Sequence, residues 1–285
     1  MKNVGLVANL DRDIGGQYLA EVVLWLLDKG LSPIVTDDVS HLVDKRCRTV
    51  CDDELYRLSD MMVVLGGDGT MLGASKSASK RNVPMIGINL GTLGYMTASE
   101  GGAGGLEALQ KTIEGNYKTE KRMMLEASVL DDNGNILTRG LLALNDVCVL
   151  RGMAPKAKSF NLHVNNQYLD TYKADGIIIA TPTGSTAYNL SAGGPILRPD
   201  MECIAITPIC PHKMDSRPMV VSAQDIVSIE LIGEYEGESI LTLDCQENIL
   251  LKRGQHVDVK MSGNYLTLIK TNDFGFYDIL RKKLH

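Results

Sequence analysis

Short apolar runs alternate with amphipathic helical stretches along the first third of this chain, and the alternation limits the folds that it can adopt. Apolar residues recur at the spacing of one helical face at Leu19, Val22, Val23, Leu26 and Leu27. We expect strands at Val4–Asn9, Pro33–Thr36, Met61–Leu65 and Val83–Ile88, and a second helix over residues 70–80. Short apolar strands joined by helices indicate a mostly parallel, Rossmann-like sheet with helices on both faces.

Strand patterning of a different kind dominates from residue 119 onward. The turn sequence Asp131-Asp132-Asn133-Gly134 predicts a hairpin between Leu125–Leu130 and Ile136–Leu144. Apolar and polar residues alternate over 257–261, as in a half-buried strand. Many short strands of this kind favour a β-rich sandwich.

Two domains are therefore expected for the 285 residues. The first is an α/β domain over residues 1–118, and the second is a β-rich domain over residues 119–269. The tail, residues 270–285, predicts an amphipathic helix that Asp273 can cap. Because a lone amphipathic helix has to bury its apolar stripe, we expect it to return to the α/β domain. The stretch Gly101–Gly105 is expected to be a flexible loop near the domain junction.

Composition excludes several classes of partner. The formal net charge is −6 and no long block of like charges occurs, so nucleic acid is not an expected partner. No apolar run approaches the roughly 18 residues that span a bilayer, so we expect no membrane partner either. The six cysteines form no C-x-x-C pair, which fits reduced thiols and a cytoplasmic location. Cys203, Cys210 and His212 lack a fourth ligand at a zinc-like spacing, so no metal ligand is assigned.

The loop Gly66-Gly67-Asp68-Gly69-Thr70 lies between a predicted strand and a predicted helix. Ligands bind at that end of a parallel strand, and N–H groups at a helix start attract phosphate. A carboxylate is a poor phosphate ligand, so the presence of Asp68 in this loop needs another explanation. It could take a proton from an attacking hydroxyl, or hold that hydroxyl in line. A loose dinucleotide fingerprint and a plain tight turn are the competing interpretations. A Walker A loop is excluded because no G-K-[ST] follows.

A second polar constellation follows an apolar strand later in the chain. The stretch Thr181-Pro182-Thr183-Gly184-Ser185-Thr186-Ala187-Tyr188 crowds small hydroxyls and a glycine into one loop. Such a loop suits a polyhydroxylated ligand, such as a sugar or nucleotide. The alternative is that the hydroxyls bond their own backbone. The pair Asn145-Asp146 interrupts another apolar run, where either a ribose or backbone N–H groups could satisfy the carboxylate.

Taken together, these segments resemble the NAD kinase family in its bacterial form. The resemblance rests on Gly66–Thr70, Asn145-Asp146, Thr181–Tyr188 and Ser191–Pro195, with Gly87–Tyr95 and Thr207–His212 in the same order and spacing. It implies an α/β domain and a β-rich domain with the active site between them. It also implies transfer of a phosphoryl group from ATP to the 2′-hydroxyl of the adenosine ribose of NAD, with Mg²⁺ or a similar divalent ion. Homodimers or homotetramers, with NAD contacts from the neighbouring subunit, are implied as well.

The resemblance also implies roles for single residues. Asp68 would be the catalytic residue, beside a phosphate loop formed by Gly66, Gly67 and Thr70. Residues implied to bind NAD are Gly69, Asn145, Asp146, Lys156, Lys173, Asp175, Thr186, Ala187, Tyr188, Asn189, Leu190, Ser191, His212 and Gln246. Many members of the family have Glu where this chain has Asp146. The alternatives are a lipid or sugar kinase with the same glycine loop, and a sensor that binds NAD(P) without turnover.

Overall fold

The computed structural model describes residues 1–285 except 92–93, 153–156, 233–238, 273 and 285. The chain forms two compact units, Met1–Lys121 together with Tyr265–His285, and Arg122–Asn264. The sequence predicts the boundaries between the two domains after residues 118 and 269. Among the described helices, none combines the length and apolar character needed to cross a membrane.

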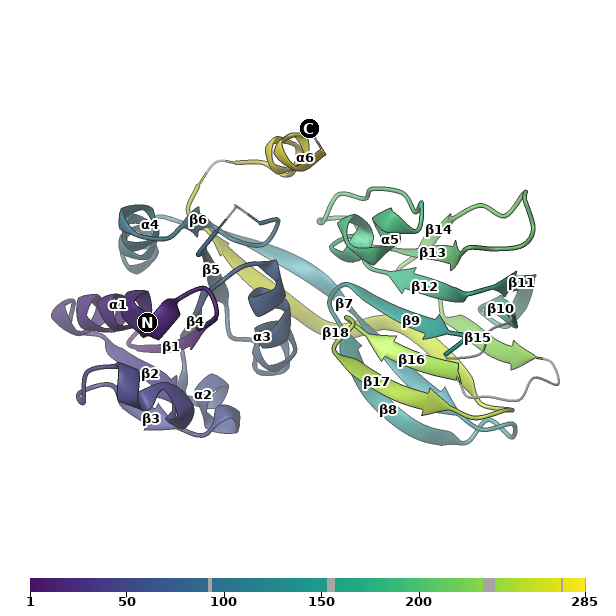
Figure 1. Cartoon of the computed structure of the whole chain (residues 1–285), viewed down its shortest axis with the longest axis horizontal. Helices are drawn as coiled ribbons and strands as arrows, with labels where there is room; N and C mark the ends of the chain where they lie inside the picture. Colours follow the sequence, from purple (N-terminus) through teal and green to yellow (C-terminus); the bar gives the residue numbers. More distant parts are fainter. Residues whose placement is uncertain (92–93, 153–156, 233–238, 273, 285) are drawn as a thin grey trace. The chain divides into compact units, whose positions relative to one another are not determined.

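The first unit is an α/β fold (Figure 1). Its strands are β1 (Asn3–Ala8), β2 (Ser32–Thr36), β3 (Arg48–Val50), β4 (Met61–Leu65), β5 (Met85–Asn89) and β6 (Ser99–Glu100). They pair in the order β3-β2-β1-β4-β5-β6, and every one of these pairs is parallel. Its helices are α1 (Gln17–Asp28), α2 (Asp52–Leu58), α3 (Asp68–Arg81), α4 (Ala103–Ile113) and α6 (Phe276–Leu284), with 3-10 turns η1 (Ile14–Gly16) and η2 (Asp37–Leu42). The predicted parallel sheet is confirmed.

Alternate residues of this sheet pack against different helical layers. Val4, Leu6 and their neighbours on β4 and β5 form a core with the apolar stripe of α1 and with α4. On the opposite face, a Cβ at Gly87 of β5 would lie 2.7 Å from Sδ of Met71 in α3. Because both faces are covered, all five residues of β4 are buried, as the continuous apolar run predicts.

The second unit is built from antiparallel strands. They are β7 (Lys118–Leu130), β8 (Ile136–Ala143), β9 (Asp146–Leu150), β10 (Lys158–Val164), β11 (Gln167–Ala174), β12 (Gly176–Ala180), β13 (Cys203–Ile209), β14 (Met219–Ser222), β15 (Val227–Ile232), β16 (Ser239–Leu243), β17 (Glu247–Leu251) and β18 (His256–Lys270). One sheet has the order β14-β13-β12-β9-β16-β17. In the other, β11-β10-β15-β18 form one ladder, and β7 pairs with both β8 and β18. Residues 265–270 of β18 belong to the first unit, where Leu268 pairs in parallel with Met85 of β5. The predicted β-rich fold is confirmed.

The predicted hairpin between β7 and β8 forms as expected, with Leu130 paired to Ile136. The carboxylate of Asp131 closes it by accepting hydrogen bonds from the backbone N–H groups of Asn133 and Asn135 at 2.9 and 2.8 Å. Local turn chemistry therefore sets this register.

Strand β12 is buried on both faces although its sheet is antiparallel. Ile178 and Ala180 pack into a cluster with Cys203 of the neighbouring strand β13 and with Leu197, which belongs to the segment that follows the hydroxyl-rich loop. Part of that segment therefore packs on one face of the six-stranded sheet, and the loop that leads into it follows the carboxyl end of β12 directly.

The glycine-rich stretch near residue 100 is not a flexible loop, so that expectation is wrong. Helix α4 begins inside it at Ala103. A Cβ at Gly105 would collide with the hydroxyl of Tyr18 and lie 2.8 Å from the side chain of Ile88. The glycine thus allows the first turn of α4 to pack closely on α1 and β5.

The C-terminal tail forms the predicted helix, α6, within the first unit. Its Phe276 ring lies 6.2 Å from the ring of Tyr95, measured between centroids, and Ile279 is buried. The helix therefore returns to the α/β unit, as expected from its apolar stripe. The predicted cap, Asp273, lies outside the described residues.

Candidate active site

The glycine loop follows β4 directly and leads into α3 at the carboxyl edge of the parallel sheet. The N–H of Gly66 donates to the carbonyl of Ile88 in β5 at 2.9 Å. Neither Gly66, Gly67 nor Gly69 has a left-handed φ, so backbone conformation does not explain the glycines. Lack of space explains Gly66, because a Cβ there would collide with the side chain of Thr70, but it does not explain Gly69, which has nothing within 4 Å of such a Cβ.

Asp68 is the first residue of α3, and backbone N–H groups fix its carboxylate. Oδ2 accepts from the N–H of Tyr95 at 2.9 Å and Oδ1 accepts from the N–H of Met96 at 3.0 Å. A Cβ at Gly94 would collide with the same carboxylate. The side chain is 30% exposed. Because a carboxylate has about four acceptor positions, Asp68 can still accept a hydrogen bond from a substrate hydroxyl.

Arg12 is a cation at this edge that the sequence reasoning missed. A Cβ at Gly67 would lie 3.1 Å from its Nη1, and one at Gly91 would lie 3.0 Å from the same atom. Arg12 follows β1, whose neighbour in the sheet is β4, so strand order brings it to the glycine loop. Its planar guanidinium suits phosphate oxygens. A cation placed just after the first strand is the sequence signal that could have found it.

A cavity of about 600 Å³ opens at the carboxyl ends of β1 and β2, between α2 and α3. Thr70 of the glycine loop lines one side and Ser77 of α3 lies further along it. Asp37 and Asp38, directly after β2, also line it. An acidic residue at the end of the second strand is where Rossmann-like sheets bind ribose hydroxyls. The sequence reasoning did not find this cavity.

In the second unit, the predicted pair Asn145-Asp146 lies where β9 begins. The carboxylate of Asp244 accepts hydrogen bonds from the N–H groups of Leu144 and Asn145, at 3.0 and 2.7 Å, and from that of Asp146 at 3.2 Å. Asp244 is itself held in a left-handed turn, with φ 54°. It was not predicted, and it braces the predicted pair.

Asp146 is only 2% exposed. Burial raises its pKa to about 6, the hydrogen bond from the Cys148 thiol lowers the pKa, and the charge of Asp244 raises it again. Its carboxyl group therefore changes charge close to physiological pH, where an exposed Asp would be fully ionised.

Several polar side chains of the hydroxyl-rich loop form hydrogen bonds within the loop or to neighbouring segments of the protein. The hydroxyl of Thr181 donates to the carbonyl of Leu144 at 2.6 Å, and that of Ser185 donates to the carbonyl of Pro182 at 2.7 Å. Asn189 is fully buried; its amide donates to the carbonyls of Ser185 and Pro195, and its oxygen accepts from Thr207. These groups hold the loop in shape, which is the interpretation that the sequence left open as the alternative.

Other residues of the same loop are more accessible. Tyr188 is 36% exposed, and partial burial raises its pKa, with the charges of Cys148, Cys245, Cys210 and Asp146 raising it further. Thr186, Ala187 and Leu190 are partly buried and Ser191 is exposed. These are the residues of the loop whose side chains are accessible to a ligand.

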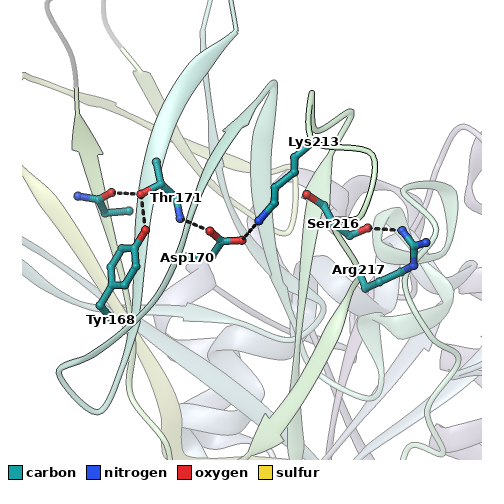
Figure 2. Close-up of polar contacts among 7 residues, drawn as sticks. Tyr168, Asp170, Thr171, Lys213, Ser216 and Arg217 are labelled. Atoms are coloured by element: carbon teal, nitrogen blue, oxygen red, sulfur yellow. Dashed lines mark hydrogen bonds and ion pairs between the residues drawn. The ribbon is translucent and has the colours of Figure 1, made fainter.

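His212 lies in the segment between β13 and β14, and it is tied to Lys173 of β11. Its N–H donates to the carbonyl of Lys173 at 2.8 Å. Figure 2 shows how the segment is fastened: Lys213 pairs with Asp170 at 3.2 Å, while Tyr168 contacts Thr171 on the same strand at 2.7 Å. The structure therefore brings the predicted residues Lys173 and His212 together.

The remaining predicted residues of the second unit have separate environments. Asp175 pairs with Arg151 at 2.9 Å. Gln246 is exposed in the turn between β16 and β17, two residues after Asp244. Lys156 lies outside the described residues. Within the described parts of the chain, no three His, Cys, Asp or Glu side chains are grouped so that they could share a metal ion.

Two family models match most of the chain. A model of the ATP-NAD kinase N-terminal domain matches residues 4–119, and a model of the ATP-NAD kinase C-terminal domain matches residues 144–271. The chain belongs to the NAD kinase family. The resemblance to the NAD kinase family that the motifs indicate is confirmed.

Curated NAD kinases match this family member over its full length. The NAD kinase of Caldanaerobacter subterraneus subsp. tengcongensis is 39% identical over 284 residues, covering 100% of this chain and 99% of the relative. The NAD kinase of Geotalea daltonii is 36% identical over 288 residues, covering 100% and 98%.

Two solved structures of the family share its fold. A yeast NADH kinase complexed with NADH has a TM-score of 0.87, with 24% identity over 99% of this chain and 86% of the other. An NAD kinase from Archaeoglobus fulgidus in complex with ATP has a TM-score of 0.77, with 24% identity over 99% and 98%. The two-domain fold of the NAD kinase family is therefore confirmed for this chain.

Proposed function

We propose that this protein phosphorylates the 2′-hydroxyl of the adenosine ribose of NAD with ATP, yielding NADP and ADP. Family membership supports the reaction class. The observation that carries the proposal is the carboxylate of Asp68, fixed by two backbone N–H groups at the start of α3 and still partly exposed beside a glycine that faces open space.

Asp68 is proposed as the residue that accepts the proton of the ribose hydroxyl or holds that hydroxyl in line. Phosphoryl transfer depends mainly on positioning and on charge neutralisation, so one oriented carboxylate suffices as the proton acceptor. The N–H groups at the start of α3, together with Gly66, Gly67 and Thr70, are proposed to hold phosphate oxygens. Gly69 would let the acceptor ribose approach closely.

ATP is proposed to occupy the cavity at the ends of β1 and β2. The carboxylates of Asp37 and Asp38 favour the hydroxyl-bearing nucleoside end, while Arg12 and the glycine loop favour the phosphates. A divalent ion such as Mg²⁺, which neutralises phosphate charge when bound, would be held mostly by ATP oxygens and water, as this ion commonly is.

NAD is proposed to bind the second unit around Asp146. Asn145 and Asp146 would accept or donate hydrogen bonds to ribose, and Tyr188 would pack against a ring. Thr186, Ala187, Leu190 and Ser191 would line the pocket, with Asn189 holding their loop in place. The further proposed NAD contacts are Lys173, Asp175, His212, Gln246 and Lys156.

Assembly and location are also proposals. The family resemblance favours a homodimer or homotetramer with NAD contacts from a neighbouring subunit, and light scattering after size-exclusion chromatography tests this directly. Cytoplasmic placement is supported by the six cysteines, which are all free thiols.

The function is tested by incubating the purified protein with ATP, Mg²⁺ and NAD and measuring NADP. Asp68→Asn keeps the shape of the side chain but removes the proton acceptor, and general-base contributions are typically about 10²–10⁴-fold. We expect kcat to fall by at least about 100-fold while NAD still binds in calorimetry.

The outcomes separate the alternative functions. Phosphorylation of a lipid or sugar with NAD left unchanged would replace the proposal with the other kinase class. Calorimetric binding of NADP by folded protein without any turnover would make the protein a sensor. Replacing NAD by NADH, and ATP by polyphosphate, defines the acceptor and donor.

A further inference from the structure

The last helix of the chain places a cation beside the proposed catalytic carboxylate. In α6, Nζ of Lys283 lies 3.7 Å from Oδ2 of Asp68. The same ammonium lies 4.8 Å from the centroid of the Tyr95 ring. Tyr95 also donates its N–H to Asp68. The same residue therefore contacts the ammonium of Lys283 with its ring and holds the carboxylate of Asp68 with its backbone.

Neighbouring cations on α6 are placed differently. Lys282 lies over the ring of Phe274, at 4.7 Å from its centroid. Arg281 pairs with Asp278 of its own helix at 3.1 Å. Favourable interaction with the helix dipole accounts for basic residues in a last turn, but it does not account for Lys283 facing Asp68. The contact of Phe276 with Tyr95 holds this face of the helix in place.

We propose that Lys283 is a functional residue of phosphoryl transfer, stabilising the charge on the phosphoryl group as it moves to the hydroxyl at Asp68. This inference rests on the proposed function. In that step a bond forms between the ribose oxygen and the γ-phosphorus, and the bond from that phosphorus to the bridging oxygen breaks. The hydroxyl proton goes to Asp68, and ADP leaves with the electron pair.

Distance supports the assignment. A hydroxyl that donates to Asp68 has its oxygen about 2.7 Å from the carboxylate, and it is to this oxygen that the incoming phosphorus forms its new bond. The Lys283 side chain is 36% exposed, so its flexible stem can shift its three N–H donors from the carboxylate to the phosphoryl oxygens. Phosphoryl-transfer enzymes commonly gain a large part of their rate from one such cation.

The test compares two methionine substitutions on the same helix. Lys283→Met and Lys282→Met each remove one ammonium that lies over an aromatic ring at nearly the same distance. Only Lys283 also faces Asp68. We expect kcat for NADP formation to fall by about 10- to 100-fold in Lys283→Met, with the KM values for ATP and NAD changed less than about threefold. Lys282→Met should keep the wild-type kcat, and Lys283→Arg should recover most of the lost rate.

Each outcome bears on a different claim. An inactive wild type overturns the proposed function and this inference with it. An active wild type with an equally active Lys283→Met variant overturns only the inference. Equal loss in the two methionine variants, or no recovery with arginine, also overturns it, because the lysine would then serve only to hold the helix. Thermal denaturation of each variant is the control: a melting temperature equal to that of the wild type shows that a loss of kcat does not come from unfolding of α6.

Discussion

At the scale of single residues, two buried aspartates of the second unit show how differently one side-chain type can be used. Asp244 accepts three backbone hydrogen bonds and so remains well solvated by the protein. Asp146 is equally buried, but the described contacts of its carboxyl group are a single thiol donor and the repulsion of Asp244. Its ionised form is therefore expensive to bury, and ligand hydroxyls would relieve that cost.

This difference predicts a pH-dependent stability. The pKa of Asp146 is about 6 in the folded chain and 3.8 ordinarily, so the folded state binds the proton more tightly than the unfolded state. The contribution of the protonated Asp146 carboxyl to the free energy of unfolding is complete below pH 3.8 and is lost as pH rises through 6. Asp146→Asn should therefore stabilise the protein at pH 8 by about 2–3 kcal/mol.

Urea denaturation at two pH values checks the sign. The gain from Asp146→Asn should be about half as large at pH 5, roughly 1.5 kcal/mol, because the folded wild-type group is then mostly protonated while the unfolded one is mostly ionised. An equal gain at both values would mean that the carboxyl group titrates elsewhere. The KM for NAD should rise in the same variant, since the amide cannot replace an ionised acceptor.

At the scale of elements, glycines in the loops serve two different purposes. Gly184 lets the hydroxyl-rich loop touch the segment before β9, since a Cβ there would collide with the backbone carbonyl of Asn145. Gly69 at the start of α3 has nothing within 4 Å of such a Cβ. The first glycine is needed by the fold, and the second is available to a ligand.

Two alanine substitutions separate these purposes. Gly184→Ala forces two backbone segments apart, and overpacking of this kind costs about 1–3 kcal/mol, so the melting temperature and NAD affinity should both fall. Gly69→Ala should melt within a degree or two of the wild type, yet raise the KM for NAD. A stable Gly184→Ala variant with normal NAD affinity would contradict this account of the loop.

The cavity beside α3 gives a prediction for the nucleotide donor. Ser77 lines it, and Phe at this position would fill much of the space proposed for adenosine. Ser77→Phe should raise the KM for ATP by about tenfold or more, the loss of roughly 1.4 kcal/mol of binding, and leave the KM for NAD unchanged. Steady-state kinetics with each substrate varied in turn distinguishes the two.

A matched control lies on the same helix. Lys80 is exposed and does not line the cavity, so Lys80→Phe adds the same ring without filling it. If Ser77→Phe and Lys80→Phe changed the KM for ATP equally, the adenosine would have to bind elsewhere.

At the scale of the whole molecule, the proposed chemistry is divided between two units of different construction. Asp68, Arg12 and the cavity belong to a parallel sheet, whose strand ends collect side chains from loops far apart in the sequence. Asp146 begins an antiparallel strand, while Tyr188 and His212 lie in segments that connect such strands. Each unit therefore positions its residues by its own strand order.

Much of this organisation could be predicted from sequence because it depends on local patterns. Apolar periodicity predicted the parallel strands and α1, the turn at Asp131 predicted the β7–β8 hairpin, and the order of motifs pointed to the family. The exception was Gly101–Gly105, where composition suggested flexibility but close packing against Tyr18 makes a helix start.

What the amino-acid sequence by itself determined was the fold class, the family and the segments that carry polar groups. What only the tertiary structure decided was which of those groups meet. Arg12 reaches the glycine loop because β1 lies next to β4, and Lys283 reaches Asp68 because α6 packs on Tyr95. The ionisation of Asp146 likewise depends on burial and on Asp244, which follows the neighbouring strand β16. Contacts and burial of this kind arise between residues distant in the chain, so no local pattern encodes them.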